Sequence, residues 1–257
     1  MTLTLTMTCI RPIKISYDGL AGVDGSARFS FGETCTALVS VSGPIAARPS
    51  SEHPARATIE VHVRPLALVP GTTEKHLAAA YKGILERACI LGQHPRTLIQ
   101  LVVQALSPQS HALVAAEINA CSLALMNSGS IPMRGVVCAV AVGLRRKKDD
   151  HRSGMEFLLD PVEESELDGA GCVAFLFNNV DLGPASASVR EQGGGMSSEV
   201  VWTNFKSCRG SVVSLDASEL AQATALARKG AAEVWLCMKK SLGGSSFDED
   251  GDCKMEM

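Results

Sequence analysis

The stretch that decides the fold is DGSARFSFGET, residues 24–34. Two strand-like runs, Ala27–Phe31 and Thr34–Val41, flank Gly32-Glu33. Because glycine is favoured in the tight turn that joins two antiparallel strands, the stretch predicts a β-hairpin near the start of the chain.

Beyond the hairpin, the spacing of the apolar residues predicts a further strand and then a helix. Residues 57–64 alternate between apolar and polar side chains, a period of two that indicates a half-buried strand. Residues 73–91 change to the spacing of an amphipathic helix. The apolar strand face holds Ile59, Val61 and Val63, the polar face holds Thr58, Glu60, His62 and Arg64, and the helical stripe holds Leu77, Ala80, Tyr81, Ile84, Ala88 and Leu91.

The rest of the chain continues this mixture of strands and helices. A helix at 111–127 is expected to stop at Gly129. The last helix is expected to begin at Asp216, with Glu219 completing a capping box and Leu215 packing on Leu220. Further strands are predicted at 97–106, 136–142, 155–159, 172–177, 200–205 and 211–215. This order of elements predicts an α+β fold, in which helices pack on mixed sheets.

Two segments have the composition of irregular structure. Residues 183–198 are poor in apolar side chains and contain Gly193–Gly195, which predicts a mobile loop. Residues 243–257 begin with glycine and serine and become acidic, which predicts a disordered tail.

Composition limits the classes of protein to which the chain can belong. Its net charge of −3 argues against broad, nonspecific nucleic-acid binding. The longest apolar run, residues 136–144, is shorter than the roughly 20 residues of a membrane-spanning helix, so we expect a soluble protein. The nine cysteines are odd in number and mostly have apolar neighbours, which favours buried thiols in a reducing compartment, the cytosol or the nucleus.

The hairpin and several later motifs together resemble the RNase PH-fold ring subunits of the eukaryotic RNA exosome. Each motif is short, but their order and spacing agree from residue 11 to residue 242. The motifs are Gly25-Ser26, Gly32-Glu33-Thr34, Gly43-Pro44, His94–Thr97, Asn119-Ala120 and Pro132–Gly135. The resemblance implies one RNase PH-like domain at 11–242, with a βαβα fold related to the second domain of ribosomal protein S5, and an N-terminal extension at 1–10.

The resemblance also implies which residues would form a catalytic site. Active relatives remove 3′ nucleotides with inorganic phosphate, and carry Asp-Gly-Gly-Thr-Arg-Thr-Ala-Ala where this chain has QSHALVAA at 109–116. Leu113 stands at the arginine position and Ala112 at the threonine position, and His111 is the one ionisable side chain. Helix positions that carry arginines in active bacterial relatives hold Leu77, Tyr81 and Ile84. We therefore predict that the phosphate site is degenerate and that no residue is catalytic.

The removal of nucleotides with inorganic phosphate in active relatives also uses a metal site. Asp160 and Glu166 keep the six-residue spacing of the family's metal-binding carboxylates. The competing interpretation is a solvated acidic turn, which Pro161 favours. We favour the turn, because a metal without the phosphate site has nothing to activate, and we predict no cofactor.

Five arginines are candidates for contact with RNA phosphates. Arg64 lies on a polar strand face, Arg96 and Arg134 match family motifs, and Arg145 and Arg146 begin a basic cluster that Asp149-Asp150 follows. The alternatives are interfacial ion pairs or a solvated hairpin loop. An aromatic content of 4% argues against a base-stacking platform.

We therefore predict a non-catalytic structural subunit of the six-membered ring, which helps to form the channel for single-stranded RNA in ribosomal RNA processing and mRNA decay. The partners implied are other RNase PH-like ring subunits, S1/KH cap subunits and exosome-associated nucleases, with no membrane. The expected location is the nucleus, nucleolus and cytoplasm. Two alternatives stay open: a phosphate-dependent 3′-exoribonuclease with a rearranged site of His111, Asp160 and Glu166, and a homo-oligomeric RNA-binding protein outside the exosome.

Overall fold

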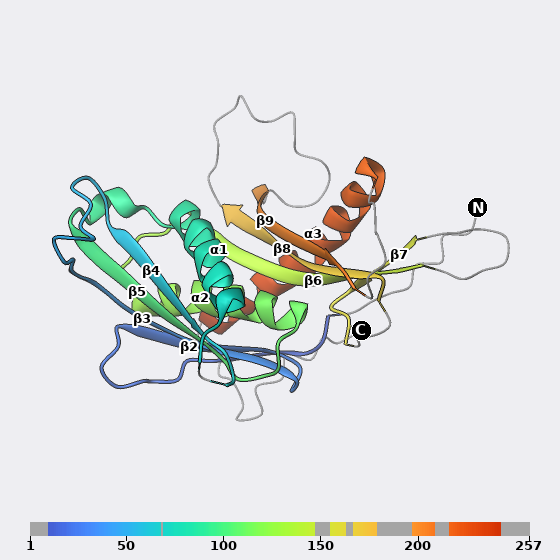
Figure 1. The fold of residues 1–257 in the computed structure, drawn as a ribbon, viewed down its shortest axis with the longest axis horizontal. Coiled ribbons are helices and arrows are strands. Elements are labelled where there is room, and N and C mark those ends of the chain that lie inside the picture. Colours follow the sequence, from blue (N-terminus) through green and yellow to red (C-terminus); the bar gives the residue numbers. More distant parts are fainter. Residues whose placement is uncertain are drawn as a thin grey trace.

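The computed structural model describes residues 10–67, 69–146, 155–162, 167–178, 197–208 and 216–242. These residues form two β-sheets and three long helices, α1 (Thr72–Ala88), α2 (His111–Ser128) and α3 (Ala217–Leu242) (Figure 1). The predicted α+β class is confirmed. The chain segments 1–9, 147–154, 163–166, 179–196, 209–215 and 243–257 lie outside the described residues, together with residue 68.

The first sheet has the strand order β1-β2-β3-β5-β4. Its strands are β1 (Ile13–Ser16), β2 (Gly25–Phe31), β3 (Cys35–Ala46), β4 (Thr58–Arg64) and β5 (Thr97–Ala105). Neighbours are antiparallel except β4 and β5, which are parallel and joined by α1. The predicted hairpin is confirmed as β2 and β3. Phe31 pairs with Cys35, so Thr34 belongs to the turn and not to the strand.

The DGSA segment at 24–27 is what attaches this hairpin to the rest of the protein. A Cβ on Gly25 would lie 2.5 Å from the carbonyl oxygen of Ala124, so only glycine lets β2 approach α2 this closely. Next to it, the side-chain amide of Asn127 donates to the carbonyl of Ser26 at 2.9 Å. The Asp24 carboxylate accepts from the Gly43 N–H at 2.7 Å. Three consecutive residues thus bind β2 to both α2 and β3.

The Gly43-Pro44 motif does not end β3, as the family pattern led us to expect. The strand continues to Ala46 through a register shift between Ser42 and Ile45. Proline has no N–H to offer β5, and the bulge absorbs that missing bond so that pairing resumes beyond it. Gly43 is at φ +132°, and a Cβ there would lie 2.6 Å from the Leu98 carbonyl oxygen.

The strand and helix predicted between 57 and 91 are confirmed, with small differences. On β4, Ile59 and Val63 are buried, whereas His62 and Arg64 are exposed. Helix α1 buries most of the predicted stripe but ends at Ala88, so Leu91 lies in a short 3-10 turn, Leu91–Gln93. The strand β1, from Ile13 to Ser16, was not predicted, because four residues are too few for a clear alternation.

The second sheet is antiparallel and has the order β7-β6-β8-β9. Its strands are β6 (Val136–Arg146), β7 (Met155–Leu159), β8 (Gly169–Asn178) and β9 (Ser197–Ser207). The expectation that Arg145 and Arg146 belong to a loop is wrong: both end β6, because β7 pairs with them and extends the hairpin. The prediction that the glycine loop extends to residue 198 is wrong at this end, since Ser197 and Ser198 belong to β9.

Helix α2 lies between the two sheets and has no exposed face. Every residue from Ala112 to Leu125 is buried, so the helix is enclosed on all sides rather than amphipathic. Two of its polar side chains form hydrogen bonds with the part of β6 that is not paired with β7. Asn119 donates to the Ala139 carbonyl at 2.9 Å and accepts from the Ala139 N–H at 2.7 Å, and Ser122 donates to the Val137 carbonyl at 2.7 Å. These side chains replace a missing strand partner.

Helix α3 covers the opposite face of the second sheet. Phe175 and Phe177 of β8 contact Arg228 and Trp235 of this helix, and Met238 lies against Cys138 of β6. The predicted start is confirmed in part, because the Asp216 N–H donates to the Glu219 carboxylate at 2.9 Å. The Leu215 contact and the strand 211–215 lie outside the described residues, as do Gly193–Gly195 and the tail.

The composition predicted that the chain has no membrane-spanning helix and that most of its cysteines are buried thiols. Among the described helices, none combines the length and apolar character needed to cross a membrane. Five cysteines are buried free thiols, as their apolar neighbours predicted: Cys35, Cys89, Cys121, Cys138 and Cys172.

Candidate functional site

The N-terminus of α2 is the place where active relatives would hold phosphate. Ser110 caps the helix, and its hydroxyl accepts the Leu113 N–H at 3.0 Å. Ala112 and Leu113 are 1% and 0% exposed, so both side chains belong to the core and neither reaches a ligand. His111 is half-buried at the first helical position. One of the N–H groups at this helix end is therefore already bound within the chain.

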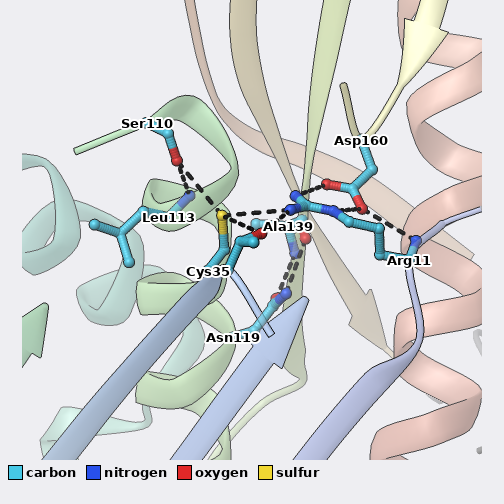
Figure 2. Close-up of polar contacts among 8 residues, drawn as sticks. Arg11, Cys35, Ser110, Leu113, Asn119, Ala139 and Asp160 are labelled. Carbon is cyan, nitrogen blue, oxygen red and sulfur yellow. Dashed lines mark hydrogen bonds and ion pairs between the residues drawn. The ribbon is translucent and has the colours of Figure 1, made fainter. Parts of the chain in front are cut away.

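Beside this helix end, Arg11 binds Asp160 (Figure 2). Arg11 precedes β1 and Asp160 follows β7, so the pair joins residues 149 positions apart. The guanidinium donates from Nε to Oδ2 at 2.7 Å and from Nη2 to Oδ1 at 2.5 Å. The backbone N–H of Arg11 adds a bond to Oδ2 at 3.1 Å. Both carboxylate oxygens of Asp160 are thus occupied by one arginine, in the bidentate geometry of a strong ion pair.

The same guanidinium extends the network toward α2. Its Nη1 donates to the Thr34 hydroxyl at 2.8 Å and to Cys35 Sγ at 3.5 Å. The Cys35 sulfur in turn lies 3.7 Å from the hydroxyl of Ser110, the residue that caps α2. Arg11 therefore fills the space between the acidic turn and the helix end, as Figure 2 shows.

Burial makes this ion pair a structural element rather than a surface contact. The Asp160 side chain is 2% exposed and that of Arg11 is 15% exposed. The hydrogen bonds from Arg11 to Asp160 raise the pKa of the guanidinium further above its usual range, against the opposing effect of burial. Asp160 also has φ +49°, a left-handed conformation that aspartate tolerates better than most residues.

The expected acidic turn does not fit a metal in the part of the chain that is described. A divalent cation at Asp160 would have to displace Arg11 from both carboxylate oxygens. Glu166, the second candidate ligand, lies outside the described residues, and Asp160 is buried rather than solvated. The described segments contain no group of three or more His, Cys, Asp or Glu side chains placed to hold an ion.

The first helix offers no phosphate ligand at the positions that carry arginines in active relatives. Leu77, Tyr81 and Ile84 are 4%, 1% and 2% exposed and face the core. The sequence identified these losses, together with Ala112 and Leu113. It gave no sign of Arg11, Thr34, Cys35 or Ser110, because the residues of this network come from four separate segments with no common motif.

The five candidate RNA-binding arginines do not form one surface. Arg64 ends β4 beside Gln104 of β5, eight residues beyond Arg96, so the two arginines lie about 26 Å apart along the sheet at about 3.3 Å per residue. Arg145 lies at the far end of β6 and donates to Glu156 at 3.1 Å. The Arg146 side chain lies outside the described part of the structure.

Arg96 and Arg134 do share one end of the molecule, at the start of β4 and β5. The Arg96 N–H bonds to the His53 carbonyl, and its own carbonyl accepts from Ala47. The Arg134 N–H bonds to Ala88 at the end of α1. These bonds bring three loops together, 47–57, 89–96 and 132–134. Their exposed arginines are Arg48, Arg56, Arg96 and Arg134, and Glu52 pairs with Arg96 at 3.3 Å.

The chain resembles known proteins, first of all in sequence. Residues 9–130 match the model of the 3′ exoribonuclease family, domain 1. Over 121 residues the chain is 36% identical to the exosome complex component rrp46 of Schizosaccharomyces pombe, which covers 47% of this chain and 53% of the relative. Over 135 residues it is 33% identical to the exosome complex exonuclease RRP46 homolog of rice, covering 52% and 56%. The chain thus matches about half the length of these curated relatives.

The likeness in three dimensions extends further. The crystal structure of rice Rrp46 matches with a TM-score of 0.71 and covers 91% of this chain and 96% of that chain, at 23% sequence identity. At that identity the likeness shows the fold, and the predicted RNase PH fold is confirmed. The resemblance to exosome ring subunits is confirmed as well. The segment His94–Thr97 predicts the subunit type called ribosomal RNA processing protein 46 in yeast, and both named relatives carry the name Rrp46.

Proposed function

We propose, from the premise that this chain has the RNase PH fold and is related over its first half to exosome components, that it is a non-catalytic ring subunit. In this role it supports 3′–5′ RNA processing and degradation by helping to form the RNA channel, while partners supply the nuclease activity. The observation that carries the proposal is Arg11, which occupies both oxygens of Asp160 and the space beside the α2 N-terminus.

The chemistry of phosphorolysis explains why this observation matters. The reaction needs cationic groups and backbone N–H donors that hold phosphate in line with the scissile bond, and carboxylates that hold a divalent metal. Here the Leu113 N–H is committed to Ser110, and the cation nearest Asp160 is committed to that carboxylate. In this network, both the helix N–H that could hold phosphate and the carboxylate that could hold a metal are already bound by other residues of the chain.

We place the RNA-contacting surface at the arginines of the three joined loops, Arg48, Arg56, Arg96 and Arg134. Four exposed guanidiniums against one nearby carboxylate, Glu52, form a local positive surface on a chain whose net charge is −3. Such a surface attracts phosphates without reading bases. Arg145 is a weaker candidate, because Glu156 neutralises it.

The proposal includes the assembly. A ring of different subunits needs two different interfaces on each member, and this chain would contact other RNase PH-like subunits through them. S1/KH cap subunits and associated nucleases would be further partners. We propose that residues 11–242 act as one domain in this assembly, and that it works in the nucleus, nucleolus and cytoplasm.

The test combines degradation and binding by the purified chain. With labelled single-stranded RNA, inorganic phosphate and Mg²⁺, we expect no nucleoside diphosphate to be released. Phosphorolysis that is abolished by Asp160→Ala would overturn the proposal in favour of the rearranged enzyme with His111, Asp160 and Glu166. A melting curve of Asp160→Ala must show that it is folded, since the substitution removes the partner of Arg11.

The binding experiment uses the same labelled single-stranded RNA. We expect the double variant Arg48→Ala, Arg56→Ala to bind more weakly and to show a smaller dependence on salt, by about one phosphate contact for each arginine. Arg28→Ala is the matched control, since Arg28 is an exposed arginine on β2 that pairs with Asp18. Purification from cells, followed by mass spectrometry, tests the assembly. Recovery of the chain as a homo-oligomer without ring subunits would favour the alternative of a homo-oligomeric RNA-binding protein outside the exosome.

A further inference from the structure

The core contains a carboxyl group that the proposed function does not use. Glu117 lies in the middle of α2 and is 0% exposed. Its Oε2 accepts a hydrogen bond from the hydroxyl of Tyr81 on α1, which is 1% exposed. Its Oε1 is buried and has no hydrogen-bond partner among the described residues. A buried carboxylate with one oxygen unsatisfied is costly, and protonation of the group removes the charge.

Apart from the Tyr81 hydroxyl, the titratable groups that act on Glu117 among the described residues do not stabilise a negative charge. Two buried thiols, Cys121 on α2 and Cys172 on β8, lie close enough for the Glu117 charge to raise the pKa of each further, beyond the larger effect of burial. Glu74 on α1 acts on Glu117 as a second negative charge. The other titratable groups of the packed strands face elsewhere. Cys35 of β3 faces Arg11 and Ser110, Cys138 of β6 faces Met238, and Arg28 of β2 pairs with Asp18.

We infer that Glu117 is a pH-sensitive contact between α1, α2 and the second sheet, and that its protonated form holds these elements together. In its protonated form, the carboxyl group joins α1 to α2 through Tyr81 and carries no charge. When it ionises, a negative charge appears inside the helix layer, with the Tyr81 hydroxyl as its hydrogen-bond donor among the described residues. The packing of α1 and β8 on α2 then weakens. The stability of the protein thus depends on pH through a group in its interior.

The direction of the response follows from the pKa values of the folded and unfolded states. Burial raises the pKa of Glu117 from 4.5 to about 7, the Tyr81 hydrogen bond opposes that rise, and Glu74 adds to it. Between these two values the folded state holds a proton that the unfolded state has lost. Stability therefore falls as pH rises from about 4.5 to 7 and is flat above.

The test measures urea unfolding of the full chain from pH 5 to pH 9. The ionisation of Glu117 raises the unfolding equilibrium constant by roughly 300-fold in total, of which about 75-fold falls between pH 5 and pH 9. In Glu117→Gln the amide cannot ionise, and this part of the pH dependence is expected to disappear. Glu86→Gln, at a half-buried site on α1, is the control and should follow the wild type. Parallel profiles for wild type and Glu117→Gln would overturn the inference.

Two further measurements keep the inference testable if Glu117→Gln fails to fold. In Tyr81→Phe the hydrogen bond that lowers the pKa of Glu117 is lost, so the fall in stability should move to higher pH. In the wild type, the infrared band of a protonated carboxyl group should persist at pH 6 and disappear above pH 8. A fall that does not move in Tyr81→Phe, or a band already absent at pH 6, would show that Glu117 is ionised in the folded protein.

Discussion

At the scale of single residues, the ion pair of Arg11 with Asp160 has the clearest consequence for stability. Removing one partner of a buried pair leaves the other charge uncompensated, which typically destabilises a protein by about 3–5 kcal/mol. Since the Asp160 side chain is 2% exposed, we expect Arg11→Ala to lower the free energy of unfolding by an amount in that range.

Arg11→Lys should lie between the wild type and Arg11→Ala, because lysine keeps the charge but loses the bidentate contact. Urea unfolding at neutral pH measures all three. Lys14→Ala is the control, since the Lys14–Glu33 pair is 43% and 88% exposed and such pairs contribute about 0–1 kcal/mol. Equal effects of Arg11→Ala and Lys14→Ala would contradict this prediction.

The sequence predicted the residues that are missing from the site more readily than those that fill it. Leu113 and Ala112 stand out because one motif can be compared position by position. Arg11 cannot be found in that way, because its partner is 149 residues away and no local pattern joins them. Glu117 is a single acid in an apolar helix, and its burial depends on the second sheet as much as on the helix itself.

At the scale of elements, the contact of α2 with the edge of β6 depends on Asn119. Its side chain satisfies both the N–H and the carbonyl of Ala139, and each buried group left unpaired costs about 1–3 kcal/mol. We expect Asn119→Ala to destabilise the protein by about 2–5 kcal/mol in urea unfolding. Ser122→Ala removes one bond, to Val137, and should cost less. A larger loss in Ser122→Ala than in Asn119→Ala would refute this account of the edge.

Element boundaries show why some of the fold could not be predicted from the sequence. Strand β4 and helix α2 were predicted because their periodicity or their end signals lie within the element. Strand β3 runs on past Pro44 because β5 pairs with it beyond the bulge, and β6 runs on to Arg146 because β7 pairs with it. In both cases a partner strand decides where the strand ends, and the residue pattern within the strand does not show that pairing.

At the scale of the whole molecule, the two sheets share one helix layer. The family model ends at residue 130, just after α2, yet the strands β6 and β8 cover part of that helix. We therefore expect a fragment of residues 1–130 not to fold as a stable monomer, because buried side chains of α2 would face water. Circular dichroism during thermal unfolding, with sedimentation, tests this. A cooperative transition of a monomeric fragment would contradict it.

The enclosure of α2 also matters while the protein is being made. Helix α2 ends at Ser128, whereas β8, the later of the two strands of the second sheet that pack on it, begins at Gly169. The ribosome therefore releases a largely apolar helix before all of the chain that covers one side of it exists. During that interval the nascent chain exposes a surface of the kind that promotes aggregation. The newly made chain should accordingly depend on chaperones until the second sheet closes over α2.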